Sequence, residues 1–200
     1  MKRNKNNKNK WYDHYAQRAR KEGFPARSVY KLQEIQDRLS VLKPRNRVLD
    51  LGCSPGSWLL FASRIVGKEG FVLGVDLKPL SIPLPPNASF IQGDIMELKD
   101  EPLIRLGGDF DVVLSDVSPS TTGHRFVDAQ RSVDLCEAVL AISHHVLKQG
   151  GIFVCKIFQG IDFKEFSDKV KKDFEHSRSF RPKSTRKGSK EIYVLGSGKK

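Results

Sequence analysis

Two residues at the ends of predicted strands could together move a proton. Lys156 lies in the apolar run V-C-K-I-F, and Asp116 follows the apolar residues of L-S-D-V-S-P. A lysine that is buried beside another cation becomes a usable general base, because its pKa falls from ~10.4 toward ~7 to 8. A lysine at a strand end with its ammonium group in water would have no such role, and the residue types alone leave both interpretations open.

A second group of residues could hold a nucleoside. The segment D-L-G-C-S-P-G-S-W, residues 50–58, contains Gly52 and Gly56, which permit a tight turn and a close approach of the backbone to a ligand above a helix N-terminus. Asp76 ends the next predicted strand, where its carboxylate can accept hydrogen bonds from both hydroxyls of a ribose. This spacing favours a cofactor that contains adenosine.

Three ligand classes compete for this turn. A pyrophosphate is disfavoured, because Ser54 replaces the second glycine of G-x-G-x-x-G and the bulky Trp58 follows Gly56 by two positions. The turn also matches the nucleophile elbow G-x-S-x-G of hydrolases, but the oxyanion hole of an elbow needs the backbone N–H after the serine, and Pro55 has none. S-adenosylmethionine remains, with its methionine part over residues 52–56 and its ribose at the end of the second strand.

Asp94 follows the third predicted strand, in Q-G-D-I, at the same edge of the sheet as Asp76. There a carboxylate can accept a hydrogen bond from the amino group of adenine. An aspartate at the end of a strand is also a common helix N-cap. The sequence leaves the two roles equally open.

The elements that must position these residues alternate along the chain. Apolar residues at helical spacing predict a first helix from about residue 26 to 42, which Pro44 ends. The repeated β-α-β units predict a doubly wound, Rossmann-like α/β fold with a mostly parallel sheet and helices on both faces. The run E-I-Y-V-L has no helix after it and is expected to add as a late antiparallel strand. The strands are predicted at 47–51, 70–76, 89–92, 110–115, 151–157 and 191–195, and the later helices at 57–66, 96–106, 128–147 and 163–174.

Positive charge is concentrated at both ends of the chain. The protein has 200 residues and a formal net charge of +12, and the first 21 residues include eight basic side chains and one acidic side chain. The segment 178–200 has the same counts, whereas the stretch between the two is close to neutral. This footprint favours contact with a nucleic acid over a role in solubility alone. We expect a basic N-terminal extension over residues 1–22 and a single catalytic domain over residues 23–200.

The N-terminus, the cysteines and the histidines argue against several other classes of protein. No apolar stretch follows the charged start of the chain, so a signal peptide is not indicated, and we expect a cytoplasmic protein without a membrane span. Cys53, Cys136 and Cys155 show no C-x-x-C spacing, and the five histidines show no metal-ligand spacing with them. We therefore expect reduced core thiols and no bound metal.

The chain resembles the FtsJ/RrmJ-like ribose 2′-O-methyltransferases over nearly its whole length. The glycine-rich turn of that family more usually reads A-A-P-G-G-W, so Cys53, Ser54 and Ser57 are departures, and Ser120 stands where Asn is common. These departures bear on cofactor affinity more than on chemistry. The resemblance rests on motifs in one order: W-Y-D-H-Y-A-Q-R-A, A-R-S-V-Y-K-L-Q-E-I, D-L-G-C-S-P-G-S-W, G-V-D-L, G-D-I, L-S-D-V-S-P-S-T-T-G, V-C-K-I-F-Q-G and K-S-T-R-K-G-S-K-E-I-Y-V.

This resemblance implies an activity and a set of site residues. The enzyme would transfer a methyl group from S-adenosylmethionine to the 2′-hydroxyl of a ribose, that of a uridine in the 23S rRNA of the large ribosomal subunit. In the implied chemistry Lys156 accepts the proton, Lys31 favours its neutral form by repulsion, and the two acids orient the ammonium groups and the ribose. The Lys-Asp-Lys-Glu tetrad of the family matches Lys31, Asp116, Lys156 and Glu191. Its cofactor contacts match Gly56, Trp58, Asp76, Asp94 and Asp116.

Two alternatives remain beside this interpretation. One is a tRNA-directed methyltransferase on the same scaffold, and the other is an RNA-binding protein without catalysis, against which the intact tetrad argues. We expect a monomer with no obligate protein partner. Without the resemblance, Lys31 and Glu191 look like ordinary surface charges.

Overall fold

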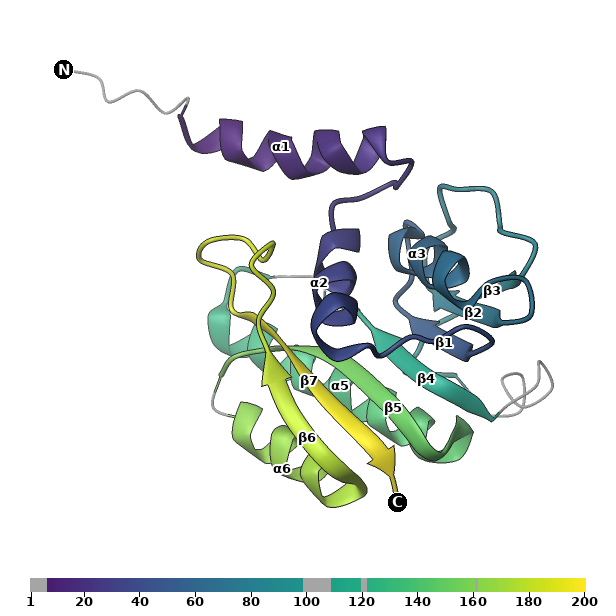
Figure 1. Ribbon diagram of the computed structural model, residues 1–200. Helices are drawn as coiled ribbons and strands as arrows, with labels where there is room; N and C mark the ends of the chain where they lie inside the picture. Colours follow the sequence, from purple (N-terminus) through teal and green to yellow (C-terminus); the bar gives the residue numbers. More distant parts are fainter. Residues whose placement is uncertain (1–6, 99–108, 120–121, 161) are drawn as a thin grey trace.

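The computed structural model describes residues 7–98, 109–119, 122–160 and 162–200 (Figure 1). Most of the helix predicted at 96–106 lies outside these residues, and so does Ser120. The remaining predicted helices and strands are all present, with ends that shift by up to four residues.

Seven strands form one sheet in the order β3-β2-β1-β4-β5-β7-β6. The first five strands in this order are parallel, and β7 runs antiparallel to both β5 and β6. This arrangement confirms the predicted mostly parallel sheet with a late antiparallel strand. The strands are β1 (Arg47–Leu51), β2 (Phe71–Asp76), β3 (Ala88–Gln92), β4 (Phe110–Ser115), β5 (Leu147–Phe158), β6 (Phe174–Phe180) and β7 (Glu191–Lys199).

Helices cover both faces of the sheet (Figure 1). On one face, α2 (Val29–Leu39) and α3 (Ser57–Val66) pack against apolar side chains that include Val48. On the other face, α5 (Arg125–Val146) and α6 (Phe163–Asp173) pack against a core that includes Leu49. Neighbouring residues of β1 thus enter opposite cores, as the period of two in a strand requires.

The first predicted helix is shorter in the structure than its apolar pattern. Val29, Leu32 and Ile35 are buried at helical spacing on α2. The helix ends where Ser40 adopts a left-handed conformation with φ of +49°, before the chain reaches Pro44. The apolar residues after Ser40 are buried in the connection to β1 instead.

A helix also forms within the predicted N-terminal extension. α1 (Asn7–Lys21) packs through Ala19, which has no exposed surface, against a cluster that includes Phe24 and Tyr30. The Arg18 guanidinium lies 4.7 Å from the centre of the Tyr30 ring. The C-terminal half of α1 is therefore tied to the entry of α2.

Cysteine, histidine and acidic side chains are the residues that could form a disulfide or bind a metal ion. Cys53, Cys136 and Cys155 are buried as free thiols, which confirms the prediction of reduced core thiols. Within the described ranges, His, Cys, Asp and Glu nowhere gather in a group of three or more that could hold a metal ion.

None of the described helices has the length and apolar character that crossing a membrane requires.

Candidate active site

Register in the sheet brings the four predicted tetrad residues to one edge. β4 and β5 run parallel, so Asp116, which follows β4 directly, lies at the same height as Lys156. β7 runs antiparallel to β5 and pairs Phe158 with Glu191. Lys31 reaches this edge from α2. Residues that are 160 positions apart in the chain therefore meet where the parallel strands end.

The four side chains form one ion-pair cluster around Asp116. Lys31 Nζ lies 2.9 Å from Glu191 Oε2 and 3.5 Å from Asp116 Oδ1. Lys156 Nζ lies 3.4 Å from the same Asp116 oxygen and donates a hydrogen bond of 2.6 Å to the main-chain oxygen of Asp116. The structure thus brings the whole predicted tetrad together, while the chemical role of each residue stays a prediction.

The carboxylate of Asp116 lies between the side-chain nitrogens of Lys31 and Lys156. Burial raises the pKa of Asp116, but Lys156 and Lys31 lower it, and the net shift is downward. Burial lowers the pKa of Lys31, but Asp116 and Glu191 raise it, and the net shift is upward. One oxygen of Asp116 thus lies 3.5 Å from Lys31 Nζ and 3.4 Å from Lys156 Nζ, while the expected effect of Lys31 on Lys156 stays a prediction.

Burial distinguishes the two lysines of the cluster. Lys156 is only 3% exposed, whereas the side chain of Lys31 is 15% exposed. The interpretation of Lys156 as a strand-end lysine with its ammonium group in water is therefore wrong. Its amine is instead enclosed and held by Asp116, which leaves it little freedom to move away from a substrate.

Tyr193 is a fifth member of the cluster that the sequence analysis did not single out. Its hydroxyl donates a hydrogen bond of 2.6 Å to Asp116 Oδ1, and its buried ring centre lies 5.7 Å from that of Trp58. Burial and the charge of Asp116 raise the pKa of Tyr193, which keeps the hydroxyl a donor. The signal was present in E-I-Y-V-L, because residues two apart on a strand share a face and Glu191 is one of them.

The glycine-rich turn between β1 and α3 adjoins this cluster. Gly52 has φ of +80°, and a Cβ at this position would lie 2.8 Å from Val117 Cα, in the segment after Asp116. Gly56 has φ of +114°, and a Cβ there would lie 2.7 Å from Ile82 Cδ1. Both positions therefore require glycine. The close approach at Gly52 puts the turn next to the ion-pair cluster at Asp116.

Asp76 binds the backbone of the turn. Its Oδ2 accepts a hydrogen bond of 2.8 Å from the N–H of Ser54, and its Oδ1 accepts one of 2.8 Å from the N–H of Lys78. Each carboxylate oxygen has two lone pairs, so both can still accept from a ribose. The Ser54 hydroxyl donates to the carbonyl of Pro79 at 3.1 Å, an arrangement that differs from a nucleophile poised beside a base.

Asp94 and Trp58 also have structural partners. Asp94 Oδ1 accepts a hydrogen bond of 2.9 Å from the N–H of Met96, in a turn over residues 95–97, and the helix that it was considered to cap lies mostly outside the described residues. Trp58 is 2% exposed, and its indole N–H donates to the carbonyl of Ser28 at 2.8 Å. A contact between Trp58 and the cofactor would therefore come through its backbone. The cofactor roles of both residues stay predictions.

Asp50 is a buried acid that the sequence analysis did not single out. It has no exposed surface, and within the described chain neither of its carboxylate oxygens has a hydrogen-bond partner. Burial, together with the charges of Asp116 and Asp76, raises the pKa of Asp50 well above its ordinary value. The signal was an acid inside the apolar strand R-V-L-D-L, where burial without a partner is costly.

The residues around the turn fit S-adenosylmethionine. Asp50 adjoins the turn with both carboxyl oxygens unpaired within the described chain, and a bound cation would favour its ionised form. S-adenosylmethionine brings such charge in its sulfonium and ammonium groups. Leu77 and Met96 follow the two predicted nucleoside-binding aspartates, and they are 61% and 54% exposed. Their apolar surface suits the faces of an adenine ring, so the site offers partners for each part of the cofactor.

Comparison with known proteins gives the family of the chain. A family model described as FtsJ-like methyltransferase matches residues 24–199. The "Ribosomal RNA large subunit methyltransferase E" of Desulfatibacillum aliphaticivorans is 58% identical over 200 residues, which cover 100% of this chain and 97% of the relative. The protein of the same name from Bdellovibrio bacteriovorus is 47% identical over 191 residues, which cover 94% of this chain and 97% of the relative.

A solved structure has the same fold. It is the crystal structure of a ribosomal RNA methyltransferase from Plasmodium falciparum, which is 26% identical and gives a TM-score of 0.76 over 87% of this chain and 97% of that one. This similarity confirms the Rossmann-like methyltransferase fold. Since the family model covers most of the sequence and the relatives match over 97% of their length, the chain belongs to the FtsJ-like methyltransferase family and uses S-adenosylmethionine as its cofactor.

Proposed function

We propose that this protein methylates the 2′-hydroxyl of a ribose, that of a uridine, in the 23S rRNA of the large ribosomal subunit. The observation that carries the proposal is the convergence of Lys31, Lys156 and Glu191 on Asp116, beside a turn that fits an adenosine cofactor. The names of the similar proteins support rRNA as the substrate. We extend the proposal to a monomer that acts in the cytoplasm.

Transfer to a ribose oxygen sets two requirements for the protein. Bound S-adenosylmethionine supplies a methyl group activated by its sulfonium. The protein must hold the 2′-oxygen in line with that methyl group, and it must take a proton from a weakly acidic alcohol. The turn at Gly52 and the cluster at Asp116 lie next to each other, so both requirements can be met at one place.

Lys156 is the proposed proton acceptor. Its nitrogen is fixed by the 2.6 Å hydrogen bond to the main-chain oxygen of Asp116. A neutral amine can donate to this oxygen and still offer its lone pair to the 2′-hydroxyl. Because the amine is enclosed, the proton would pass to it directly from the substrate and not through bulk water.

The other cluster residues are proposed to align the ribose. Lys31 is held by Glu191 at 2.9 Å, and its nitrogen can donate to a ribose oxygen without leaving that carboxylate. The Tyr193 hydroxyl fixes Oδ1 of Asp116. These bonds hold the donors and acceptors in place before the RNA arrives, which lowers the entropic cost of alignment.

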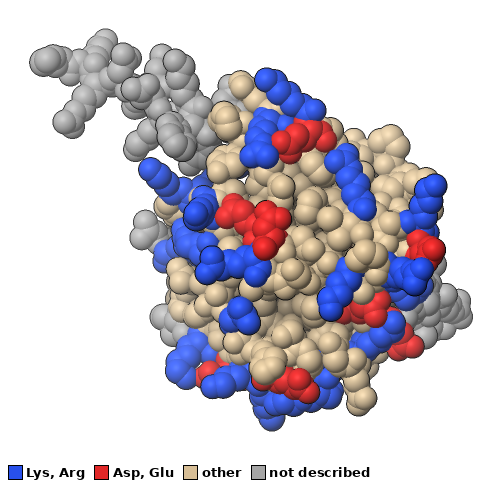
Figure 2. Space-filling view, in the orientation of Figure 1, with Lys and Arg blue, Asp and Glu red and all other residues tan. Residues whose placement is uncertain are grey.

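Positive side chains around the loop between β6 and β7 support RNA as the substrate. Figure 2 shows Lys and Arg side chains gathered over the region of the loop between β6 and β7, below α1. Phosphate groups would be attracted to this region. The loop itself, over residues 181–190, carries five basic side chains, Arg181, Lys183, Arg186, Lys187 and Lys190.

Methyl incorporation from labelled cofactor tests the substrate. We expect label in the 23S rRNA of large ribosomal subunits or in free 23S rRNA, and little label in tRNA. Label in tRNA alone would assign the enzyme to the tRNA-directed alternative. Absence of label in all three RNAs, with RNA binding retained, would favour the binding protein without catalysis.

A further inference from the structure

The basic segments from the two ends of the chain meet at one arginine. The Arg27 guanidinium lies 5.0 Å from the centre of the Tyr15 ring, which belongs to α1. Its Nη2 also donates a hydrogen bond of 2.8 Å to the carbonyl of Ser184, in the basic loop 181–190. A side chain in the turn before α2 therefore contacts both of the segments that concentrate positive charge.

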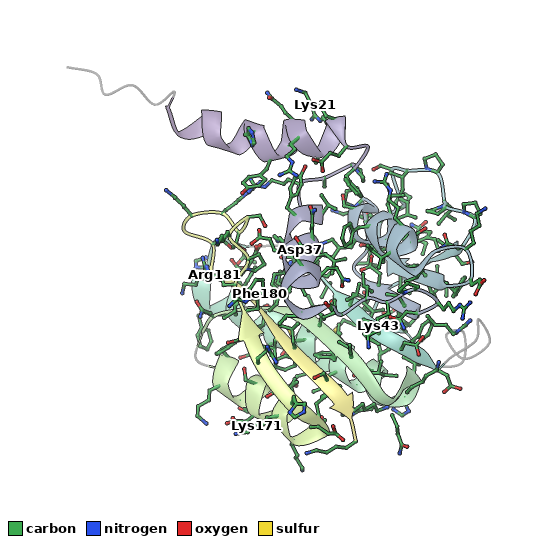
Figure 3. The ribbon with its side chains drawn as sticks, in the orientation of Figure 1. Lys21, Asp37, Lys43, Lys171, Phe180 and Arg181 are labelled. Atoms are coloured by element: carbon green, nitrogen blue, oxygen red, sulfur yellow. The ribbon has the colours of Figure 1, made fainter. Side chains whose placement is uncertain are left out.

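The two ends of the basic loop are held by main-chain groups. The Arg181 side chain, labelled beside Phe180 in Figure 3, donates to the carbonyl of Ser189. The N–H of Gln159 donates to the carbonyl of Lys190 at 2.8 Å. These bonds fix the loop where it leaves β6 and where it enters β7, but they do not reach residues 183–187.

Glu34 on α2 holds the middle of the loop. Its Oε2 accepts a hydrogen bond of 2.6 Å from the N–H of Lys183, and its Oε1 accepts one of 2.8 Å from the N–H of Ser184. With the bond from Arg27 to Ser184, three polar groups of two neighbouring residues are bound by side chains from α2 and its entry. A carboxylate that accepts two backbone N–H bonds fixes a loop more firmly than a neutral acceptor does.

The same face of α2 also carries a tetrad residue. Lys31 and Glu34 are three positions apart, so they lie on one side of the helix. Lys31 binds Glu191, the residue that follows the basic loop. The helix thus fixes the position of the basic side chains relative to the catalytic cluster.

We propose that Glu34 and Arg27 are positioning residues for RNA: they fix the basic loop 181–190 against α2, so that an RNA backbone bound by the loop presents its ribose to the tetrad. This inference rests on the proposed function. The negative charge of Glu34 repels phosphate, but its carboxylate holds the backbone of the basic loop. We therefore expect Glu34 to favour RNA binding.

Glu34→Gln separates positioning from simple electrostatics. Loss of a negative charge near a polyanion should by itself tighten RNA binding. If Glu34 positions the loop, the variant should instead raise the KM for RNA by about tenfold, because glutamine keeps one neutral acceptor and turns an NH2 donor toward the second backbone N–H. The kcat at saturating RNA and the Kd for the cofactor should stay unchanged. Glu34→Asp, which keeps the charge but shortens the side chain, should also raise the KM.

Glu69→Gln is the matched control, because it removes the same charge from an exposed ion pair with Arg45. Thermal unfolding shows whether each variant is folded, and if Glu34→Gln is not, Arg27→Lys tests the same contact with charge retained and should raise the KM. A KM for RNA that is unchanged or lower in the folded variants would overturn the inference. Loss of methylation in wild type and control alike would instead overturn the proposed function, and the inference with it.

Discussion

Two neighbouring regions at one edge of the sheet differ in whether their ionisable side chains have hydrogen-bond or ion-pair partners. Around Asp116, the side-chain nitrogens of Lys31 and Lys156 lie within 3.5 Å of a carboxylate oxygen, and the Tyr193 hydroxyl completes the cluster. In β1, just before the glycine-rich turn, both carboxyl oxygens of Asp50 lack a hydrogen-bond partner within the described chain. The first region is satisfied before a ligand arrives, whereas the second is not.

The difference between the two regions matches the two substrates of the reaction. A paired cluster suits a neutral alcohol, which brings no charge of its own and needs only alignment and a group that accepts its proton. An unsatisfied acid suits a ligand that brings positive charge and offsets the cost of burial. Substitutions on the two sides should therefore have separable effects, on transfer in one case and on cofactor binding or stability in the other.

The largest effect is expected from Lys156→Ala. Loss of the general base should lower methyl transfer by roughly 10²-fold to 10⁴-fold, while the Kd for the cofactor stays unchanged. Single-turnover rates and calorimetry measure the two quantities. Lys164→Ala, on the exposed face of α6, is the control for removing a lysine. A transfer rate within about tenfold of wild type would remove the role of base from Lys156.

Asp76→Ala should show the opposite pattern. The variant loses a carboxylate that can accept from both ribose hydroxyls, so cofactor binding should weaken by about 2 kcal/mol or more, while RNA affinity is kept. Titration calorimetry with the cofactor measures the change, and Asp168→Ala on α6 is a matched control. An unchanged cofactor Kd would exclude Asp76 from the cofactor site.

Asp50→Asn should change how stability depends on pH. The pKa of Asp50 is raised in the folded state, so the native protein keeps this proton to a higher pH than the unfolded chain does. The Asp50 carboxyl therefore lowers the free energy of unfolding progressively as the pH rises above its unfolded pKa of about 3.9. The Tm of the variant relative to wild type should rise between about pH 4 and about pH 8. An equal Tm difference at both ends of this range would contradict the account of Asp50.

The smallest effect is expected from deletion of residues 1–10. The deletion removes Lys2, Arg3, Lys5, Lys8 and Lys10 but leaves Tyr15 and Ala19, which tie α1 to the domain, so the Tm should barely change. RNA affinity should fall, and the slope of log K against log salt should become shallower by about 0.7 to 0.9 for each RNA phosphate that the truncated protein no longer neutralises. If the slope stays the same, these lysines serve solubility only, and RNA is held by other basic groups.

The central sheet was predictable because its strands are buried on both faces. Runs such as R-V-L-D-L and F-D-V-V-L-S carry enough apolar residues to indicate a buried parallel strand. β6 was missed because F-E-H-S-R-S-F is mostly exposed and pairs along one edge only, with β7, so its sequence carries no apolar alternation. The helix α1 was missed for a similar reason, because it packs through small and aromatic residues within a basic sequence.

The site was predictable only where the chain order fixes the geometry. Asp116 and Lys156 end neighbouring parallel strands, so their meeting follows from the predicted topology. Lys31 and Glu191 reach the cluster through the packing of α2 and the insertion of β7, which depend on contacts between distant segments. The spacing of residues along the sequence does not indicate contacts between distant segments. Only the family resemblance pointed to Lys31 and Glu191.

The position of the transferred methyl group tests the central claim most directly. RNA methylated by the wild-type enzyme with labelled cofactor would be hydrolysed in alkali, which requires a free 2′-hydroxyl to cleave the neighbouring phosphodiester. Methylation of a ribose 2′-oxygen predicts that the label is recovered in alkali-resistant dinucleotides. Recovery of the label in mononucleotides would show methylation of a base and would contradict the account of the Lys31, Asp116, Lys156 and Glu191 cluster.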